Sequence, residues 1–210
     1  PFIDWQLTQL RAQGLNHVVL CLGFLGEQVE EFVGDGSRWG LQVGYSYDGE
    51  VLLGTGGALR RALPQLGDSF WILYGDSYLP VDYAAVAATW KRSGLPGLMT
   101  VYRNEGLYDT SNVIFEQDSI VLYDKKQQLP EMAHIDYGLG LLKSDILAAW
   151  PENHVFDLAE VYTEMVKQGQ MAGHEVHQRF YEIGSHAGLA ELSDLPVSYT
   201  HLRAHETEAD

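Results

Sequence analysis

Three short stretches of this 210-residue sequence place glycine beside residues that could do chemistry. The first, residues 53–58, reads Leu-Gly-Thr-Gly-Gly-Ala and lies between a predicted strand and a predicted helix. Glycine lets the backbone approach a ligand closely, and the start of a helix offers N–H groups to an anion or a carbonyl. The spacing fits neither the dinucleotide fingerprint nor the P-loop, and such a stretch is more often only a tight turn.

The other two stretches each place a carboxylate at the end of an apolar strand. Asp76 lies in Gly75-Asp76-Ser77, and Glu182 lies in residues 180–185, Phe-Tyr-Glu-Ile-Gly-Ser. In open α/β sheets, ligands bind beyond the carboxyl ends of the strands. Mg²⁺ takes one or two carboxylates together with phosphate oxygens and water. Two such carboxylates in one crevice would complete a metal site; the sequence leaves open whether they meet, and whether Asp76 only caps the next turn.

The histidines and the single cysteine indicate structure rather than chemistry. His174 and His177 form H-x-x-H, which in a strand puts the rings on opposite faces, so we expect a solvent-exposed pair and no metal. Cys21 can form neither an internal disulfide nor a zinc site by itself. Because it lies in the apolar run 18–22, we expect a buried structural thiol.

Strands and helices alternate in the first half of the chain, which predicts an α/β fold with a mostly parallel sheet and helices on both faces. A helix over residues 2–13 precedes Gly14. The predicted strands are 16–22, 41–47, 70–74 and 97–102, and the predicted helices are 26–32, 57–63 and 83–92, the last capped by Asp82.

The second half adds antiparallel or mixed strands. The pattern predicts strands at 112–115 and 119–123, a strand at 134–142 broken by Gly138 and Gly140, and a strand at 173–183. Between the last two, Asp157 is expected to cap a helix that runs to Lys167.

The charge balance excludes several classes of partner. Thirteen Lys and Arg against 29 Asp and Glu give a net charge of −16, which argues against a basic face for DNA or RNA and against an anionic membrane. A single nucleotide is not excluded, because a metal ion and a few amides can bind its phosphates. No stretch is long and apolar enough to span a membrane and no signal peptide opens the chain, so a cytoplasmic protein is expected.

Together with Ile135-Asp136-Tyr137-Gly138, the three glycine-containing stretches resemble the sugar-phosphate nucleotidylyltransferases in order and spacing, from residue 1 to 195. The chain looks most similar to mannose-1-phosphate and heptose-1-phosphate guanylyltransferases. The resemblance implies a Rossmann-like nucleotide-diphospho-sugar transferase fold, a mostly parallel mixed sheet flanked by helices. It also implies transfer of a nucleotidyl group from a nucleoside triphosphate to a sugar 1-phosphate, with release of pyrophosphate, for polysaccharide or glycan precursors.

The resemblance assigns three groups of site residues. Glu182 departs from the aspartate common at its position, and Lys125 and Lys126 are alternatives for one phosphate-binding lysine. The nucleotide-binding group is Gly54, Thr55, Gly56 and Gly57; the catalytic group, which also binds Mg²⁺, is Asp76 and Glu182; the sugar-phosphate group is Asn112, Lys125, Lys126, Asp136 and Gly138.

The ends of the chain differ from the family pattern. The family's N-terminal glycine-rich loop, with its arginine and Pro-Lys pair, would precede Pro1, so we expect a nucleotidyltransferase domain over 1–195 that lacks this loop and the first strand. A chain of this kind is expected to be inactive as given. Residues 196–210 have no core face and are expected to be a non-native tail.

Two other functions stay open at this stage. One is a non-catalytic, sugar-nucleotide-binding regulatory protein on the same fold. The other, a dinucleotide-dependent dehydrogenase, is disfavoured because no strand carries G-x-G-x-x-G. The expected partners of the enzyme are a nucleoside triphosphate and a sugar 1-phosphate, with neither nucleic acid nor membrane; a homo-oligomer remains open.

Overall fold

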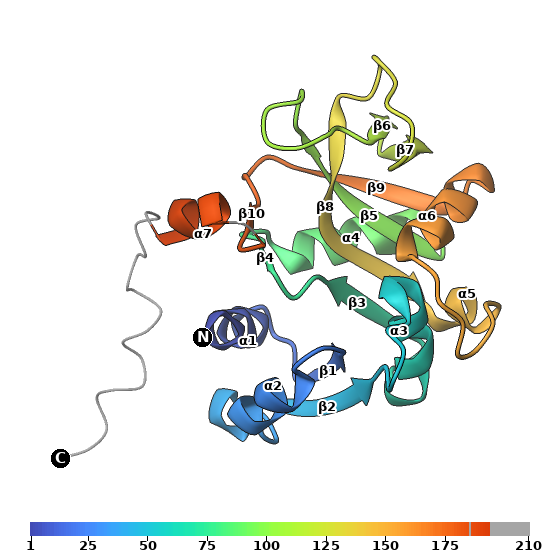
Figure 1. Ribbon diagram of the computed structural model, residues 1–210. Coiled ribbons are helices and arrows are strands. Elements are labelled where there is room, and N and C mark those ends of the chain that lie inside the picture. Colours follow the sequence, from blue (N-terminus) through green and yellow to red (C-terminus); the bar gives the residue numbers. More distant parts are fainter. Residues whose placement is uncertain (185, 194–210) are drawn as a thin grey trace.

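A mixed six-stranded sheet with helices on both faces forms the larger part of the computed structural model, which describes residues 1–184 and 186–193 (Figure 1). The α/β class and the mixed sheet are confirmed. Among the described strands, however, only β1–β2 and β5–β9 pair in parallel, because β8 inserts antiparallel between β3 and β5. The strand order is β3 (Ser69–Leu73), β8 (His134–Lys143), β5 (Gly97–Arg103), β9 (Met171–Val176), β7 (Ser119–Tyr123) and β6 (Val113–Glu116).

Each face of the sheet packs on its own hydrophobic core, because successive residues of a strand point to opposite faces. In β5, Leu98 packs with α1 (Phe2–Ala12) and α4 (Tyr83–Ser93). The next residue, Met99, packs on the other face with α6 (Leu158–Lys167) and α5 (Ser144–Ala148). Neither side chain has any exposed surface, so this central strand anchors both layers.

The two predicted aspartate caps are confirmed. The side chain of Asp82 accepts the N–H groups of Ala84 and Ala85 at the start of α4. Asp157 forms a capping box with Glu160 at the start of α6. A capping side chain satisfies N–H groups that have no partner inside the helix, so both helix starts are determined locally.

A second, two-stranded sheet lies apart from the first. It consists of β1 (His17–Leu22) and β2 (Gln42–Tyr47), with α2 (Gly26–Val33) and a 3₁₀ turn (Ser37–Trp39) between them. A cavity of about 830 Å³, lined mostly by apolar side chains of α1, β1 and β3, separates β1 from β3. Among the described residues, β1 pairs only with β2 and β3 pairs only with β8, so each has one unpaired edge.

This cavity explains why the prediction of a buried Cys21 is wrong. Cys21 lines the cavity and is exposed, because no strand lies against that edge of β1 in the described part of the chain. Its Sγ lies 3.8 Å from the carbonyl oxygen of Ala58. The apolar run 18–22 therefore predicted the strand correctly, but it did not predict that the Cys21 side chain would be exposed.

Three element boundaries differ from the prediction. The helix expected from residue 57 begins earlier, as α3 (Gly54–Ala62), followed by a 3₁₀ turn (Leu63–Gln65). Strand β8 runs unbroken through Gly138, which has φ +97°, where its register with β5 shifts. The strand expected at 173–183 is two strands, β9 and β10 (Tyr181–Glu182), and β10 pairs with β4 (Ser77–Tyr78).

Helix α7 (His186–Ser193) is the last described element, and the predicted tail at 196–210 lies outside the described residues. In the described part of the chain, no helix has the length and apolar character needed to cross a bilayer.

Candidate active site

The structure brings the two strand-end carboxylates together. In the antiparallel β4–β10 pair, Glu182 lies opposite Ser77, and the N–H of Ile183 donates to the carbonyl oxygen of Asp76 at 2.9 Å. Figure 1 shows these strands side by side although about a hundred residues separate them. Asp76 and Glu182 therefore lie next to each other at the two-stranded β4–β10 sheet, as a shared site requires.

The electrostatics of this pair favour a cation. Burial raises the pKa of Glu182, as do the negative charges of Asp76, Asp109 and Asp136, while Lys125 lowers it less. Two carboxylates are the hard oxygen ligands that Mg²⁺ prefers. In residues 1–184 and 186–193 no cluster of three or more His, Cys, Asp or Glu could hold a metal alone. The pair fits a metal whose other ligands come from substrate phosphates and water.

A second unit surrounds Asp136 in β8. Its Oδ1 accepts the N–H of Gly138 at 3.0 Å, and its own N–H donates to Oδ1 of Asn112 at 3.0 Å. Burial raises the pKa of this carboxyl group, an effect that the Gly138 N–H, Lys125 and Tyr123 offset only in part. Asn112, Asp136 and Gly138, predicted separately, thus form one hydrogen-bonded unit.

The structure distinguishes between the two adjacent lysines. Nζ of Lys125 lies 5.9 Å from the ring centroid of Tyr74, and its charge lowers the pKa of both Asp136 and Glu182. The charge of Lys126 instead lowers the pKa of Asp124, whose carboxylate also accepts the backbone N–H of Lys126 at 2.7 Å. Only Lys125 therefore faces the carboxylates of the site.

Tyr74 is a site residue that the sequence did not indicate. Burial raises the pKa of its phenol, and the charges of Asp136, Asp157 and Asp76 raise it further. The phenol therefore stays protonated among three carboxylates and can act as a hydrogen-bond donor. The only signal in the sequence was its position, directly before Gly75-Asp76.

The glycine-rich stretch has a packing role. The N–H groups of Gly56 and Gly57 both donate to the carbonyl oxygen of Phe156, at 3.1 and 3.3 Å. A Cβ on Gly56 would lie 2.4 Å from the Phe156 ring, and one on Gly57 would lie 2.4 Å from the carbonyl oxygen of His154. These two amides are therefore not free for a ligand. Gly54 and Thr55 are exposed and line the cavity beside Tyr74, so ligand contact by residues 54–57 remains a prediction.

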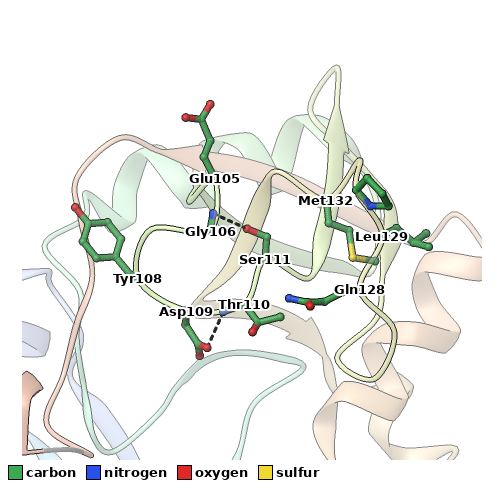
Figure 2. A pocket seen from close by; sticks show the side chains of 10 residues that line it. Glu105, Gly106, Tyr108, Asp109, Thr110, Ser111, Gln128, Leu129 and Met132 are labelled. Atoms are coloured by element: carbon green, nitrogen blue, oxygen red, sulfur yellow. Dashed lines mark hydrogen bonds between the residues drawn. The ribbon is translucent and has the colours of Figure 1, made fainter.

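A polar pocket of about 600 Å³ lies beside this site, between the loop 105–111 and residues 128–132 (Figure 2). Nδ2 of the buried Asn104 donates to the carbonyl oxygen of Asp109 and to Oγ of Ser111, which also accepts the Gly106 N–H. The loop is therefore held in a fixed shape directly before Asn112. No pattern in the sequence indicated this pocket.

The prediction of an exposed histidine pair is wrong for one member. His174 is partly buried in β9, and its Nδ1 lies 2.9 Å from Oγ1 of Thr89 in α4. Burial lowers the pKa of its imidazole, while His177 is exposed. Helix α4 packs against β9, and the contact between His174 and Thr89 joins the helix to this strand.

Two carboxylates, a lysine and a half-buried aspartate thus gather beside a mixed α/β sheet that is flanked by helices. Solved structures share this fold. HddC from Yersinia pseudotuberculosis matches with a TM-score of 0.75 and 18% identity over 91% of this chain and 83% of that chain. UDP-glucose pyrophosphorylase from Acinetobacter baumanii matches with a TM-score of 0.71 and 13% identity over 91% and 80%.

Curated proteins resemble the chain over most of its length, although no family model matches it. N-acetylmuramate alpha-1-phosphate uridylyltransferase from Neisseria meningitidis is 26% identical over 201 residues, 93% of this chain and 84% of that protein. D-glycero-alpha-D-manno-heptose 1-phosphate guanylyltransferase from Campylobacter jejuni is 26% identical over 88% of this chain and 80% of that protein. The match to UTP–glucose-1-phosphate uridylyltransferase from Synechocystis spans about half of that protein, 48%. The chain is thus related to the sugar-1-phosphate nucleotidylyltransferases.

Proposed function

We propose that the protein to which this nucleotidyltransferase domain belongs transfers a nucleotidyl group from a nucleoside triphosphate to a sugar 1-phosphate, giving a nucleotide sugar and pyrophosphate. The observation that carries the proposal is the pairing of β4 with β10, which sets Glu182 beside Asp76. Lys125 and Asp136 face the same place, and the curated relatives are enzymes of this reaction type.

The reaction needs positioning more than a strong base. An oxygen of the sugar 1-phosphate attacks the α-phosphorus, and the bond from that phosphorus to the leaving pyrophosphate breaks. The attacking phosphate is already ionised, so no side chain has to remove a proton. Catalysis then consists of in-line alignment and of stabilising the negative charge that develops.

Each residue of the site has a role in this proposal. Lys125 holds the phosphate of the sugar, and Asp136 with Asn112 and Gly138 contacts the sugar hydroxyls. Asp76 and Glu182 hold Mg²⁺, which when bound supplies positive charge to the triphosphate. These roles suit a protein with a net charge of −16, because a bound metal ion, and not a cluster of Lys and Arg side chains, supplies the positive charge for the triphosphate.

Mg²⁺ and a cytoplasmic location belong to the same proposal. The oxygen-only donor pair supports Mg²⁺ over a softer metal. Nucleoside triphosphates as substrates support the cytoplasm. We also propose products that feed polysaccharide or glycan synthesis, as the relatives' sugar phosphates suggest.

We further propose that the chain as given has little or no transferase activity. In support, β1 and β3 each leave one edge unpaired among the described residues, and an apolar cavity of about 830 Å³ lies between them. A strand inserted there would run beside Gly54, Thr55 and Tyr74, which line the cavity. Pyrophosphate release by the purified chain at the rate of the Neisseria relative would overturn this proposal.

The main proposal is tested on the complete protein. A thermal-shift screen of UTP, GTP and dTTP with Mg²⁺, and of glucose and mannose 1-phosphates, should show stabilisation that grows as ligand exceeds its Kd. Asp76→Asn should abolish Mg²⁺-dependent pyrophosphate release, whereas Asp145→Asn, an exposed carboxylate in α5, should leave it unchanged. Full activity of the Asp76 variant would contradict the proposed role.

A further inference from the structure

The guanidinium of Arg179 lies against two tyrosine rings. It is 4.0 Å from the ring centroid of Tyr108 and 4.9 Å from that of Tyr181. It also forms an ion pair with Glu191 of α7. Arg179 therefore links three segments: the loop 104–111, strand β10 and helix α7.

Stacking holds this arginine in place. Its Nε is buried and hydrogen-bonds to nothing among the described residues. An unsatisfied buried donor is unfavourable, so the planar contacts with the tyrosines and the ion pair must hold the side chain. A planar guanidinium makes such contacts and an ammonium does not make them equally well.

The neighbouring Phe180 fixes the same segment to the large sheet. Its ring meets Tyr102, Tyr108 and Tyr137 edge-on, with centroid distances of 6.0, 6.2 and 6.0 Å. It is 6% exposed. Residues 179–181 are thus fixed on both sides immediately before Glu182.

Glu182 needs such support because little else holds it. Strand β10 is two residues long, and its ladder with β4 has two residue pairs. The charges of Asp76, Asp109 and Asp136 all act against the ionised Glu182. Asp109 follows Tyr108 directly in the loop 104–111 (Figure 2). Arg179 contacts this loop through the Tyr108 ring.

We propose that Arg179 is a positioning residue: stacked between Tyr108 and Tyr181, it ties β10 to the loop 104–111 and so keeps Glu182 next to Asp76. The inference deepens the proposed function and rests on it. Arg179 itself touches no substrate in this proposal and acts through the placement of Glu182.

The test uses the chain as given, with two measurements that need no turnover. Mn²⁺ affinity is measured by electron paramagnetic resonance, and amide hydrogen exchange is measured at Ile183, whose N–H is bonded to Asp76. Arg179→Lys keeps the positive charge but loses the planar guanidinium group. It should weaken Mn²⁺ binding about tenfold, because losing a residue that supports a metal ligand has an effect of this size. It should also speed exchange at Ile183.

Two further variants separate positioning from general damage. Tyr108→Ala should reproduce both effects and Tyr108→Phe neither, because phenylalanine keeps the ring. Arg103→Lys is the matched control, since Arg103 pairs with Glu105 in solvent near the same loop. The effects of the double variant Arg179→Lys/Tyr108→Ala should be smaller than the sum of the two single effects, because both changes remove the Arg179–Tyr108 contact while Tyr108→Ala also loses the contact with Phe180.

The two measurements separate the positioning role from the metal site. Wild-type affinity and exchange in both Arg179→Lys and Tyr108→Ala would overturn the positioning role. Absence of Mn²⁺ binding by the wild-type chain would instead mean that these two carboxylates hold no metal without substrate phosphates. In that case the exchange rate at Ile183 alone decides whether Arg179 holds β10.

Discussion

The hydroxyl of Thr55 joins two helices that are far apart in the chain: its Oγ1 lies 3.2 Å from Oδ1 of Asp157, 102 positions later. The same Oγ1 accepts the N–H of Leu158 at 2.8 Å, at the start of α6. The Asp157 carboxylate in turn raises the pKa of Tyr74 and Asp136. The contact between α3 and α6 therefore fixes the position of Asp157, whose negative charge acts on Tyr74 and Asp136 of the candidate site.

Thr55→Val should lower the free energy of unfolding by about 1–2 kcal/mol, because it keeps the shape but loses both hydrogen bonds. The Leu158 N–H would be left without its partner at the start of α6. Thr55→Ser keeps the hydroxyl and should be close to wild type. Urea unfolding measures all three proteins, and equal midpoints for the valine and serine variants would contradict the linkage.

Gly56→Ala should destabilise the fold by about 1–3 kcal/mol through overpacking. Alanine normally stabilises a helix relative to glycine, so the sign depends on the Cβ, which would lie 2.4 Å from the Phe156 ring. Gly75→Ala is the matched control, since a Cβ there meets nothing within 4 Å. A thermal-melting temperature for Gly56→Ala at or above that of Gly75→Ala would show that Phe156 moves aside.

Sequence reasoning succeeded where the signal was local. Asp82 and Asp157 lie directly before helical patterns, and a cap needs only the next three residues. It failed where a distant segment decides the outcome. The exposure of Cys21 depends on what lies beside β1, and the contact that holds Arg179 depends on Tyr108, which lies in a loop far earlier in the chain.

The site was predictable in its residue types but not in its assembly. A carboxylate after an apolar strand indicates a crevice, and both Asp76 and Glu182 were identified in this way. Their proximity required the β4–β10 pair, which is too short to leave a periodic pattern. The preference for Lys125 over Lys126 required the position of Tyr74.

Lys125→Met should weaken binding of a sugar 1-phosphate by the complete protein about ten- to a hundredfold, the cost of losing a charge-assisted hydrogen bond. Lys126→Met should bind as wild type does, because the charge of Lys126 acts on Asp124, whereas Lys125 is the lysine that lowers the pKa of Asp136 and Glu182. The KM for the sugar phosphate, or calorimetric titration, measures the difference. Equal losses in the two variants would contradict the assignment to Lys125.

Cys21 should react slowly with iodoacetamide at neutral pH although it is exposed. Although Cys21 as a residue is exposed, desolvation of its thiol in the cavity wall, and then the charge of Asp48, raise the pKa of that thiol to about 11. The thiolate is the nucleophile, so the alkylation rate should climb steadily with pH past the value of about 8.5 where an ordinary thiol levels off. Glutathione serves as the reference thiol, and a plateau in the Cys21 rate below about pH 9 would refute the raised pKa.

Asp136→Asn should stabilise the fold at neutral pH while impairing sugar binding. Because burial raises the pKa of Asp136 above its ordinary 3.8, the folded state binds more protons than the unfolded state between the two values. Stability contributed by this group is therefore complete below pH 3.8 and is lost as pH rises through the folded pKa. Asparagine avoids this loss because it carries no charge, and it keeps an acceptor for the Gly138 N–H.

The melting temperature of Asp136→Asn should therefore exceed that of wild type at neutral pH and converge with it under acid conditions, below the ordinary aspartate pKa of 3.8. For a chain of this size, about 1 kcal/mol of added stability corresponds to a rise of about 2–4 °C, which calorimetry resolves. Asp145→Asn, at an exposed position, should show no such divergence between the two conditions. An Asp136 variant less stable than wild type at neutral pH would mean that the carboxylate is held by partners stronger than the cost of its burial.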